Sequence, residues 1–124
     1  MNKIICNSVD FVFRNEIKTM KPGEAPVLID TALWKKINVT EQPVYQSSVK
    51  QSDAGPTNEE TVTARARHNN IVSMLIEYCG FYVVLRLSTD EKTFYTGTID
   101  YPCTIEYTSD QIFDNYTFKA ISPA

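Results

Sequence analysis

The sequence predicts a mainly β protein of the α+β class: a β-sandwich or partly open barrel with one α-helix and a long protruding β-hairpin. Tyrosine and phenylalanine occur seven and six times in 124 residues, beside many valines, isoleucines and threonines, and these residue types favour strands. Apolar and polar residues alternate in short runs separated by turn residues. With 43% apolar and 22% charged residues, the chain suits a single domain, residues 1–124, with one core.

The first third of the chain predicts a strand, a loop and a short helix. The run KIICNSVDFVFRNEI carries apolar residues at alternating positions, as a half-buried strand does. Two prolines and a glycine punctuate residues 20–26 and indicate a loop. Asp30 can then cap a short helix or a helical turn over residues 31–36. We expect Trp34, the single tryptophan, to pack in the core or at an interface, with a ligand platform as the alternative use.

Residues 45–70, YQSSVKQSDAGPTNEETVTARARHNN, contain two valines and no leucine, isoleucine, methionine or phenylalanine. Odd positions from 45 to 49 share one face of an extended chain. SDAGPTN is rich in turn residues, and Val62, Ala64 and Ala66 then alternate with polar side chains. We interpret the segment as a polar hairpin arm with one mildly apolar face of small residues.

The remainder predicts one helix and four strands. Asn70 can cap a helix through IVSMLIEYC, which has helical spacing and ends at Gly80, although so short an apolar run could also continue as a strand. Turn residues then separate four strand-like runs: FYVVLRLS, KTFYTGTI, CTIEYTS and NYTFKAIS.

Few residues in the sequence suggest chemistry. The three cysteines, Cys6, Cys79 and Cys103, are odd in number and contain no C-x-x-C pair, so we expect buried thiols in a reducing cytoplasm. His68 is the only histidine and lies at the polar end of the arm, where it supports neither nucleophilic catalysis nor a metal site. We therefore expect no enzyme activity, no catalytic residue, no cofactor and no metal.

Charge and hydropathy exclude two further classes. The net charge is −3, and residues 88–124 carry six acids and two lysines, which leaves −4 there and +1 elsewhere. Because no basic cluster exists, specific nucleic-acid binding is not expected. The most apolar stretch, residues 71–87, is interrupted by Glu77, Gly80 and Arg86, so no membrane span is expected. The N-terminal MNKIIC is too short for the apolar region of a signal peptide, so none is expected.

The polar arm raises an energetic question. Ordering the backbone of residues 45–70 costs on the order of 25–50 kcal/mol. Burying two valines returns only about 1.5–3 kcal/mol each, and an isolated two-stranded hairpin is marginally stable. The arm is therefore either mobile or completed by a neighbour. Its regular alternation and balanced charges differ from those of flexible linkers and favour a neighbour.

We expect that neighbour to be a second copy of the chain, because open strand edges accept strands from other molecules and head-to-tail repetition generates rings. The expected subunit interface follows the arm and consists of Tyr45, Val49, Lys50, Val62, Ala64, Arg65, Ala66 and Arg67.

This layout resembles the small β-sandwich virion proteins of tailed bacteriophages, of the tail-tube and tail-completion type. The run YVVLRLSTDEKTFYTGTIDYPCTIEYTSDQIFDNYTFKAIS is also similar to the ending of small virion proteins from phages of gut Bacteroides-type hosts. The resemblance covers residues 37–124 and transfers no functional residue. It implies hexameric rings joined by hairpins, with an acidic lumen through which DNA passes without specific contacts.

The resemblance thus implies a structural virion subunit, as tail tube, tail terminator or neck component. Its partners would be copies of itself and other virion proteins, without a membrane, and it would be assembled in the host bacterial cytoplasm. The alternative is a monomeric β-sandwich binding module for a carbohydrate or a host protein. That alternative predicts an aromatic cluster on one exposed face.

Overall fold

The computed structural model describes residues 2–21, 24–53, 55–67, 82–110 and 112–123. The helix predicted after Asn70, together with His68 and Cys79, lies outside the described residues. The described chain is mainly β, as predicted. Its elements are β1 (Asn2–Ile5), β2 (Ser8–Phe13), the 3-10 helix η1 (Arg14–Glu16), β3 (Ile17–Thr19), β4 (Val27–Leu28), β5 (Lys35–Lys36), β6 (Val44–Ser52), β7 (Gly55–Arg67), β8 (Val83–Ser88), β9 (Thr93–Thr96), β10 (Thr104–Ser109) and β11 (Phe113–Pro123).

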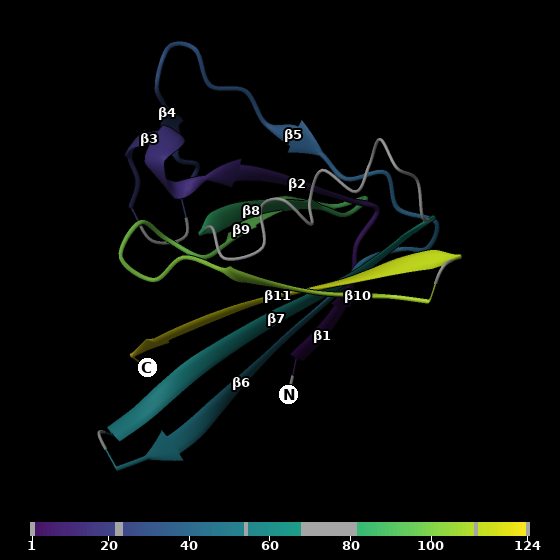
Figure 1. Cartoon of the computed structure of the whole chain (residues 1–124). Coiled ribbons are helices and arrows are strands. Elements are labelled where there is room, and N and C mark those ends of the chain that lie inside the picture. Colours follow the sequence, from purple (N-terminus) through teal and green to yellow (C-terminus); the bar gives the residue numbers. More distant parts are fainter. Residues whose placement is uncertain (1, 22–23, 54, 68–81, 111, 124) are drawn as a thin grey trace.

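The strands form two larger antiparallel sheets and a small two-stranded one (Figure 1). The five-stranded sheet has the order β1-β6-β7-β11-β10, and the four-stranded sheet has the order β5-β2-β8-β9. The small sheet pairs β3 with β4. The four predicted C-terminal strands are therefore present, but they divide between the two larger sheets. The chain changes sheet between β9 and β10.

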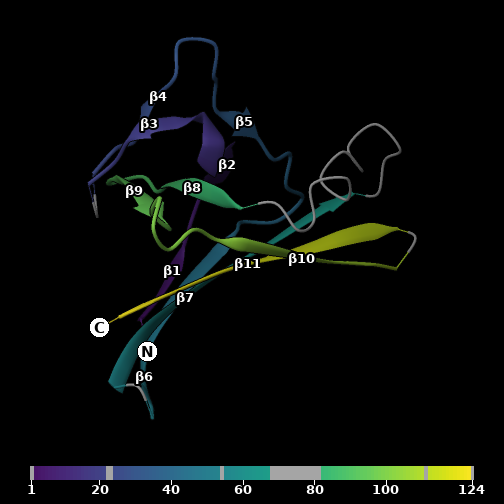
Figure 2. The ribbon, with the colours of Figure 1, turned by 60° about the vertical axis from the view of Figure 1, so that its left-hand side comes forward.

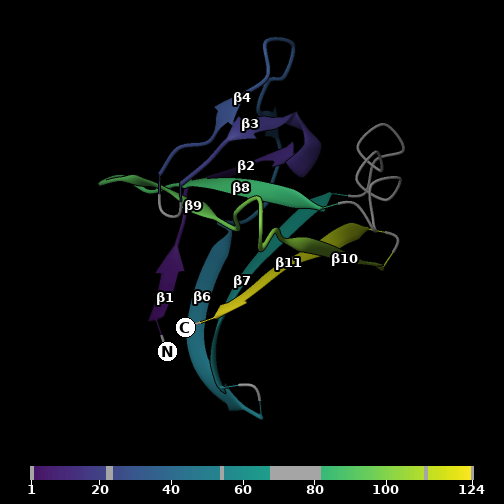
Figure 3. The same ribbon diagram turned by 90° about the vertical axis from the view of Figure 1, so that its left-hand side faces the viewer.

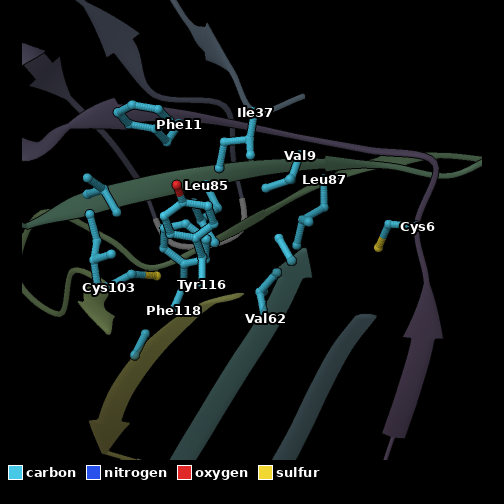
Figure 4. Packing of buried hydrophobic residues seen from close by; sticks show 14 of the residues in the cluster. Cys6, Val9, Phe11, Ile37, Val62, Leu85, Leu87, Cys103, Tyr116 and Phe118 are labelled. Carbon is cyan, nitrogen blue, oxygen red and sulfur yellow. The ribbon is translucent and has the colours of Figure 1, made fainter. Parts of the chain in front are cut away.

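The core lies between the two larger sheets. Side chains of β2 and β8 point toward those of β7 and β11 (Figure 4). Tyr116 and Phe118 are the largest fully buried side chains of this core, and Leu85 and Leu87 meet them from β8. Burying one apolar side chain of this size stabilises the folded state by roughly 1.5–3 kcal/mol. This packing holds the five-stranded sheet in place beside the four-stranded one.

The predicted N-terminal strand is two strands. β1 pairs with β6 in one sheet, whereas β2 pairs with β8 in the other. The change of sheet occurs at Cys6 and Asn7, whose backbone N–H groups donate to the carbonyl oxygens of Pro43 (2.8 Å) and Ser88 (2.6 Å). Cys6 is fully buried at this crossing, in agreement with the expectation of a buried thiol.

Residues 31–36 form no helix: the N–H group of Ala32 donates to the carbonyl oxygen of Ile29 (3.0 Å) in a single turn, and β5 follows at Lys35–Lys36. Lys35 and Lys36 pair with Phe11 and Asp10 of β2, so the sheet edge determines the conformation of this stretch. Six residues are also too few to hold a helix by local hydrogen bonds alone. Trp34 packs on a small second cluster around Val12, Ile17 and Val84, on the other face of the four-stranded sheet.

Candidate functional site

The candidate site is a projecting part of the five-stranded sheet. From here on the name arm is used for this part, which differs in its residues from the predicted arm of residues 45–70. It comprises residues 48–52 of β6, 55–60 of β7 and 120–123 of β11. β6 and β7 pair from Val44↔Thr63 to Ser52↔Gly55, and their far ends extend away from the four-stranded sheet (Figures 2 and 3). Ala120 is the only buried residue of the arm among the side chains described. The core therefore does not cover the arm.

A third strand from the same chain completes the arm, which corrects the premise of an isolated two-stranded hairpin. β11 pairs with β7 along its whole length, from Phe113↔Arg67 to Pro123↔Thr57. β7 is thus hydrogen-bonded on both sides, and three strands can be stable where two are marginal. The order of the arm therefore needs no second molecule. What a second molecule could still contact are the outer edges of β6 and β11.

An ion network crosses the outer face of the arm, which is the face opposite to the one that carries Val62 and the other core residues of β7. The carboxylate of Glu59 lies 3.0 Å from the Nζ atom of Lys50 on β6 and 3.3 Å from that of Lys119 on β11. These are cross-strand pairs, which stabilise sheets modestly. The hydrogen bond from Lys50, with a smaller contribution from Lys119, holds the pKa of Glu59 below its usual range. The network links all three strands of the arm.

Tyr45 ties the base of the arm to the other sheet. Its hydroxyl group donates a hydrogen bond to Oε2 of Glu60 at 2.7 Å, and its ring meets that of Phe94 on β9 edge to face, 5.1 Å between centroids. Burial, followed by the hydrogen bond and charge of Glu60, raises the pKa of Tyr45 to about 12. Tyr45 was predicted to contact a neighbouring subunit, but these contacts lie within the chain.

Besides Arg65, four of the predicted interface residues lie on β7, and they divide between the two faces of that strand. Val62, Ala64 and Ala66 are at most 5% exposed and belong to the chain's own core, so their assignment to a subunit interface is corrected. Their alternation was read correctly, but it marks the core-facing side of β7. Arg67 on the opposite face is exposed.

Arg65 lies on the outer face but is held by its own chain. Its guanidinium group stacks on the ring of Phe113 at 4.0 Å and approaches Glu41 (3.4 Å) and Asp110 (3.7 Å). Arg65 also lines a pocket of about 350 Å³ between residues of β7, β11 and the segment that contains Gln42. These contacts hold the guanidinium group of Arg65 at the base of the arm against partners within its own chain.

The arm itself presents two exposed apolar side chains. Val49 on β6 is 65% exposed, as its place in the predicted interface requires, and Ile121 on β11 is 51% exposed. Lys50, also predicted, is exposed beside Val49. Ile121 and Glu59 were missed. The run NYTFKAIS suggested a strand, but nothing in it indicates that this strand lies beside residues 55–60.

The rest of the described chain shows little that could support chemistry. No group of three or more His, Cys, Asp or Glu side chains within it could hold a metal ion. Cys6 and Cys103 are fully buried, and burial raises the pKa of both thiols. Among the helices of the described residues, none is long and apolar enough to span a membrane.

Trp34 is partly covered by its own chain. The guanidinium group of Arg86 lies 4.7 Å from the Trp34 ring centroid, and the ring of Tyr95 lies 6.1 Å away. Arg86 is in turn fixed by two hydrogen bonds to Oδ2 of Asp10, at 2.9 and 3.1 Å. A sugar stacking on Trp34 would have to compete with this arginine for a ring face.

Comparison of the chain with protein-family models, with curated proteins and with solved structures found no match.

Proposed function

We propose that the chain is a self-assembling structural subunit of a tailed-bacteriophage virion, a β-sandwich that forms rings through its arm as part of a tail tube, tail terminator or neck. The observation that carries this proposal is the arm: three strands that leave the core and, among the side chains described, bury only Ala120. The arm is ordered within one chain by β11, but its exposed polar surface adds little to the core of a monomer. A subunit that contacts its neighbours with the extension gains an interface.

The edges of the arm support an assembly role. β1 accompanies β6 only over residues 44–47, and β10 accompanies β11 only over residues 114–119. Within the described chain, residues 48–52 and 120–123 therefore pair on one side only. Such edges accept strands from other molecules. Repetition of one such contact around an axis closes a ring, for which we propose six copies by analogy with phage tail tubes.

The charge distribution is compatible with a lumen for DNA. Residues 88–124 carry a charge of −4, because six acids face two lysines. An acidic wall repels the phosphate backbone and lets DNA pass without specific contacts. Partners in this proposal are further copies of the chain and other virion proteins. The monomeric binding module draws less support, since Arg86 covers a face of the best aromatic platform.

Size-exclusion chromatography with light scattering, together with negative-stain microscopy, tests the proposal directly. The wild-type protein should form rings or short tubes at micromolar concentration. A variant in which an Asn-Gly turn replaces residues 48–59 keeps the pairs Gln46↔Thr61 and Tyr45↔Val62 and should fold as a monomer.

The matched control is Leu33→Ser, which removes an apolar side chain that is 77% exposed but lies outside the arm. This control should assemble as the wild type does. A wild-type protein that stays monomeric at every concentration would exclude the proposal. Rings formed by the shortened variant would show that assembly uses another surface.

A further inference from the structure

The two uncovered edges of the arm lie on opposite sides of the same three strands. β6 and β11 both flank β7, so residues 48–52 form one edge and residues 120–123 the other. The two segments are similar in length and lie at the same end of the sheet (Figure 3). In an edge strand, alternate residues direct their N–H and C=O groups away from the paired neighbour. Each edge therefore offers a short row of backbone donors and acceptors.

The charges of the two edges differ. Residues 48–52 read SVKQS and contain Lys50 as their only charged residue, in the middle of the segment. Residues 120–123 read AISP and carry no charge. If two copies paired through residues 48–52 in antiparallel orientation, Lys50 would lie opposite Lys50 of the second copy. Like charges directly opposite each other on neighbouring strands are destabilising.

Resting on the proposed function, we infer that the edge of β6 in one copy pairs with the edge of β11 in the next copy. In this pairing Lys50 lies beside uncharged residues and keeps its own partner, Glu59, at 3.0 Å. The contact joins two different surfaces, so the first copy retains a free β11 edge and the second copy a free β6 edge. Such head-to-tail contacts extend until a ring closes. Lys50 would thereby select this pairing over a closed dimer.

Cross-linking between two variants that each carry one added cysteine tests this inference. Val49 and Ser122 both lie opposite Asn58 and therefore on the same face of the arm. Val49→Cys protein is mixed with tagged Ser122→Cys protein and treated with a short bismaleimide, and the products are separated by mass. The product that joins Val49→Cys to Ser122→Cys should exceed the product that joins two Val49→Cys chains. Wild-type protein, with its native cysteines, gives the background.

The matched control mixes Val49→Cys with Glu106→Cys, whose exposed position lies on β10, away from both edges. Equal yields for the control and test mixtures, in samples that light scattering shows to be assembled, would overturn the edge pairing and leave ring assembly standing. Monomers at all concentrations would instead overturn the proposed function itself. The two failures are thus distinguished.

A second variant tests the role of the charge. With Lys50→Gln in the Val49→Cys background, pairing of β6 with itself loses its repulsion. The product that joins two Val49→Cys chains should then rise by up to about fivefold, as expected for removal of a like-charge pair across strands. An unchanged yield would show that Lys50 does not select the pairing.

Discussion

Val49 and Val62 form a matched pair for testing the arm, because they lie on the two strands of one hairpin and face the same side of the sheet. Val62 is fully buried, whereas Val49 is 65% exposed. The same substitution, valine to alanine, should therefore act on folding at Val62 and on assembly at Val49. The loss of β-branching is common to both variants and cancels in the comparison.

The expected magnitudes follow from burial. Removing two methyl groups from Val62 takes away about 1.6 kcal/mol of transfer free energy, and the cavity raises the total to roughly 2–3 kcal/mol. For 124 residues the unfolding entropy is about 0.26 kcal/mol per kelvin, so Tm should fall by roughly 8–12 °C. Because Val49 is 65% exposed, only about one-third of this transfer free energy applies to it. The expected loss of stability is then roughly 0.6 kcal/mol, and the expected fall in Tm is about 2 °C.

Thermal unfolding followed by circular dichroism, at a concentration where the protein is monomeric, measures the first effect. Light scattering at higher concentration measures the second. Val49→Ala should lose only about 2 °C in Tm and assemble more weakly than the wild type, while Val62→Ala should lose roughly 8–12 °C. An equal fall in Tm for both variants would mean that the arm packs against the core in solution. Normal assembly of Val49→Ala would remove Val49 from the interface.

Three further predictions concern the contacts around the arm and the core. Glu59→Gln removes a carboxylate whose pKa the two flanking lysines hold below the usual 4.5, so its stabilisation is present at neutral pH and lost as the pH falls below that range. Urea unfolding should show a deficit for this variant at pH 7 that shrinks in acid, and a constant deficit would contradict the ion network. Gly97→Ala should lower Tm more than Gly55→Ala. Both positions have positive φ, which costs an alanine about 1–2 kcal/mol, but only at Gly97 would the new Cβ lie 3.0 Å from Sγ of Cys103. Ultraviolet titration should show a tyrosine that ionises near pH 12 and is missing in Tyr45→Phe, and a native titration without this step would contradict the buried hydrogen bond.

The sequence predicted those features that depend on local alternation. The mainly β class is confirmed, and the small residues of β7 are buried at the alternating positions that the pattern indicated. The four C-terminal strands also lie where turn residues divide the chain. These features follow from a period of two between core-facing side chains, which is visible within a few residues. Val49 and Lys50, which were predicted to lie in a subunit interface, are both exposed, and the interface itself stays a prediction.

Features that depend on distant partners were not predictable in this way. Nothing within residues 113–123 indicates that they pair with residues 57–67, because any strand of suitable length offers the same backbone groups. The helix expected near Trp34 failed for a related reason. Capping and composition favoured a helix there, but pairing of Lys35 and Lys36 with β2 outweighed this weak local preference.

The third strand changes what assembly has to achieve. In a two-stranded arm, a neighbouring subunit would have to complete β7 before the arm could be ordered, so folding and assembly would be coupled. With β11 beside it, β7 is paired on both sides, and the unpaired groups lie on the outer edges of β6 and β11. Assembly then adds strands to a preformed sheet and does not carry the entropy of ordering the arm. Two short edges, of which only the β6 edge carries a lysine, can therefore suffice for a reversible contact. Many equal contacts around a ring then stabilise the whole assembly.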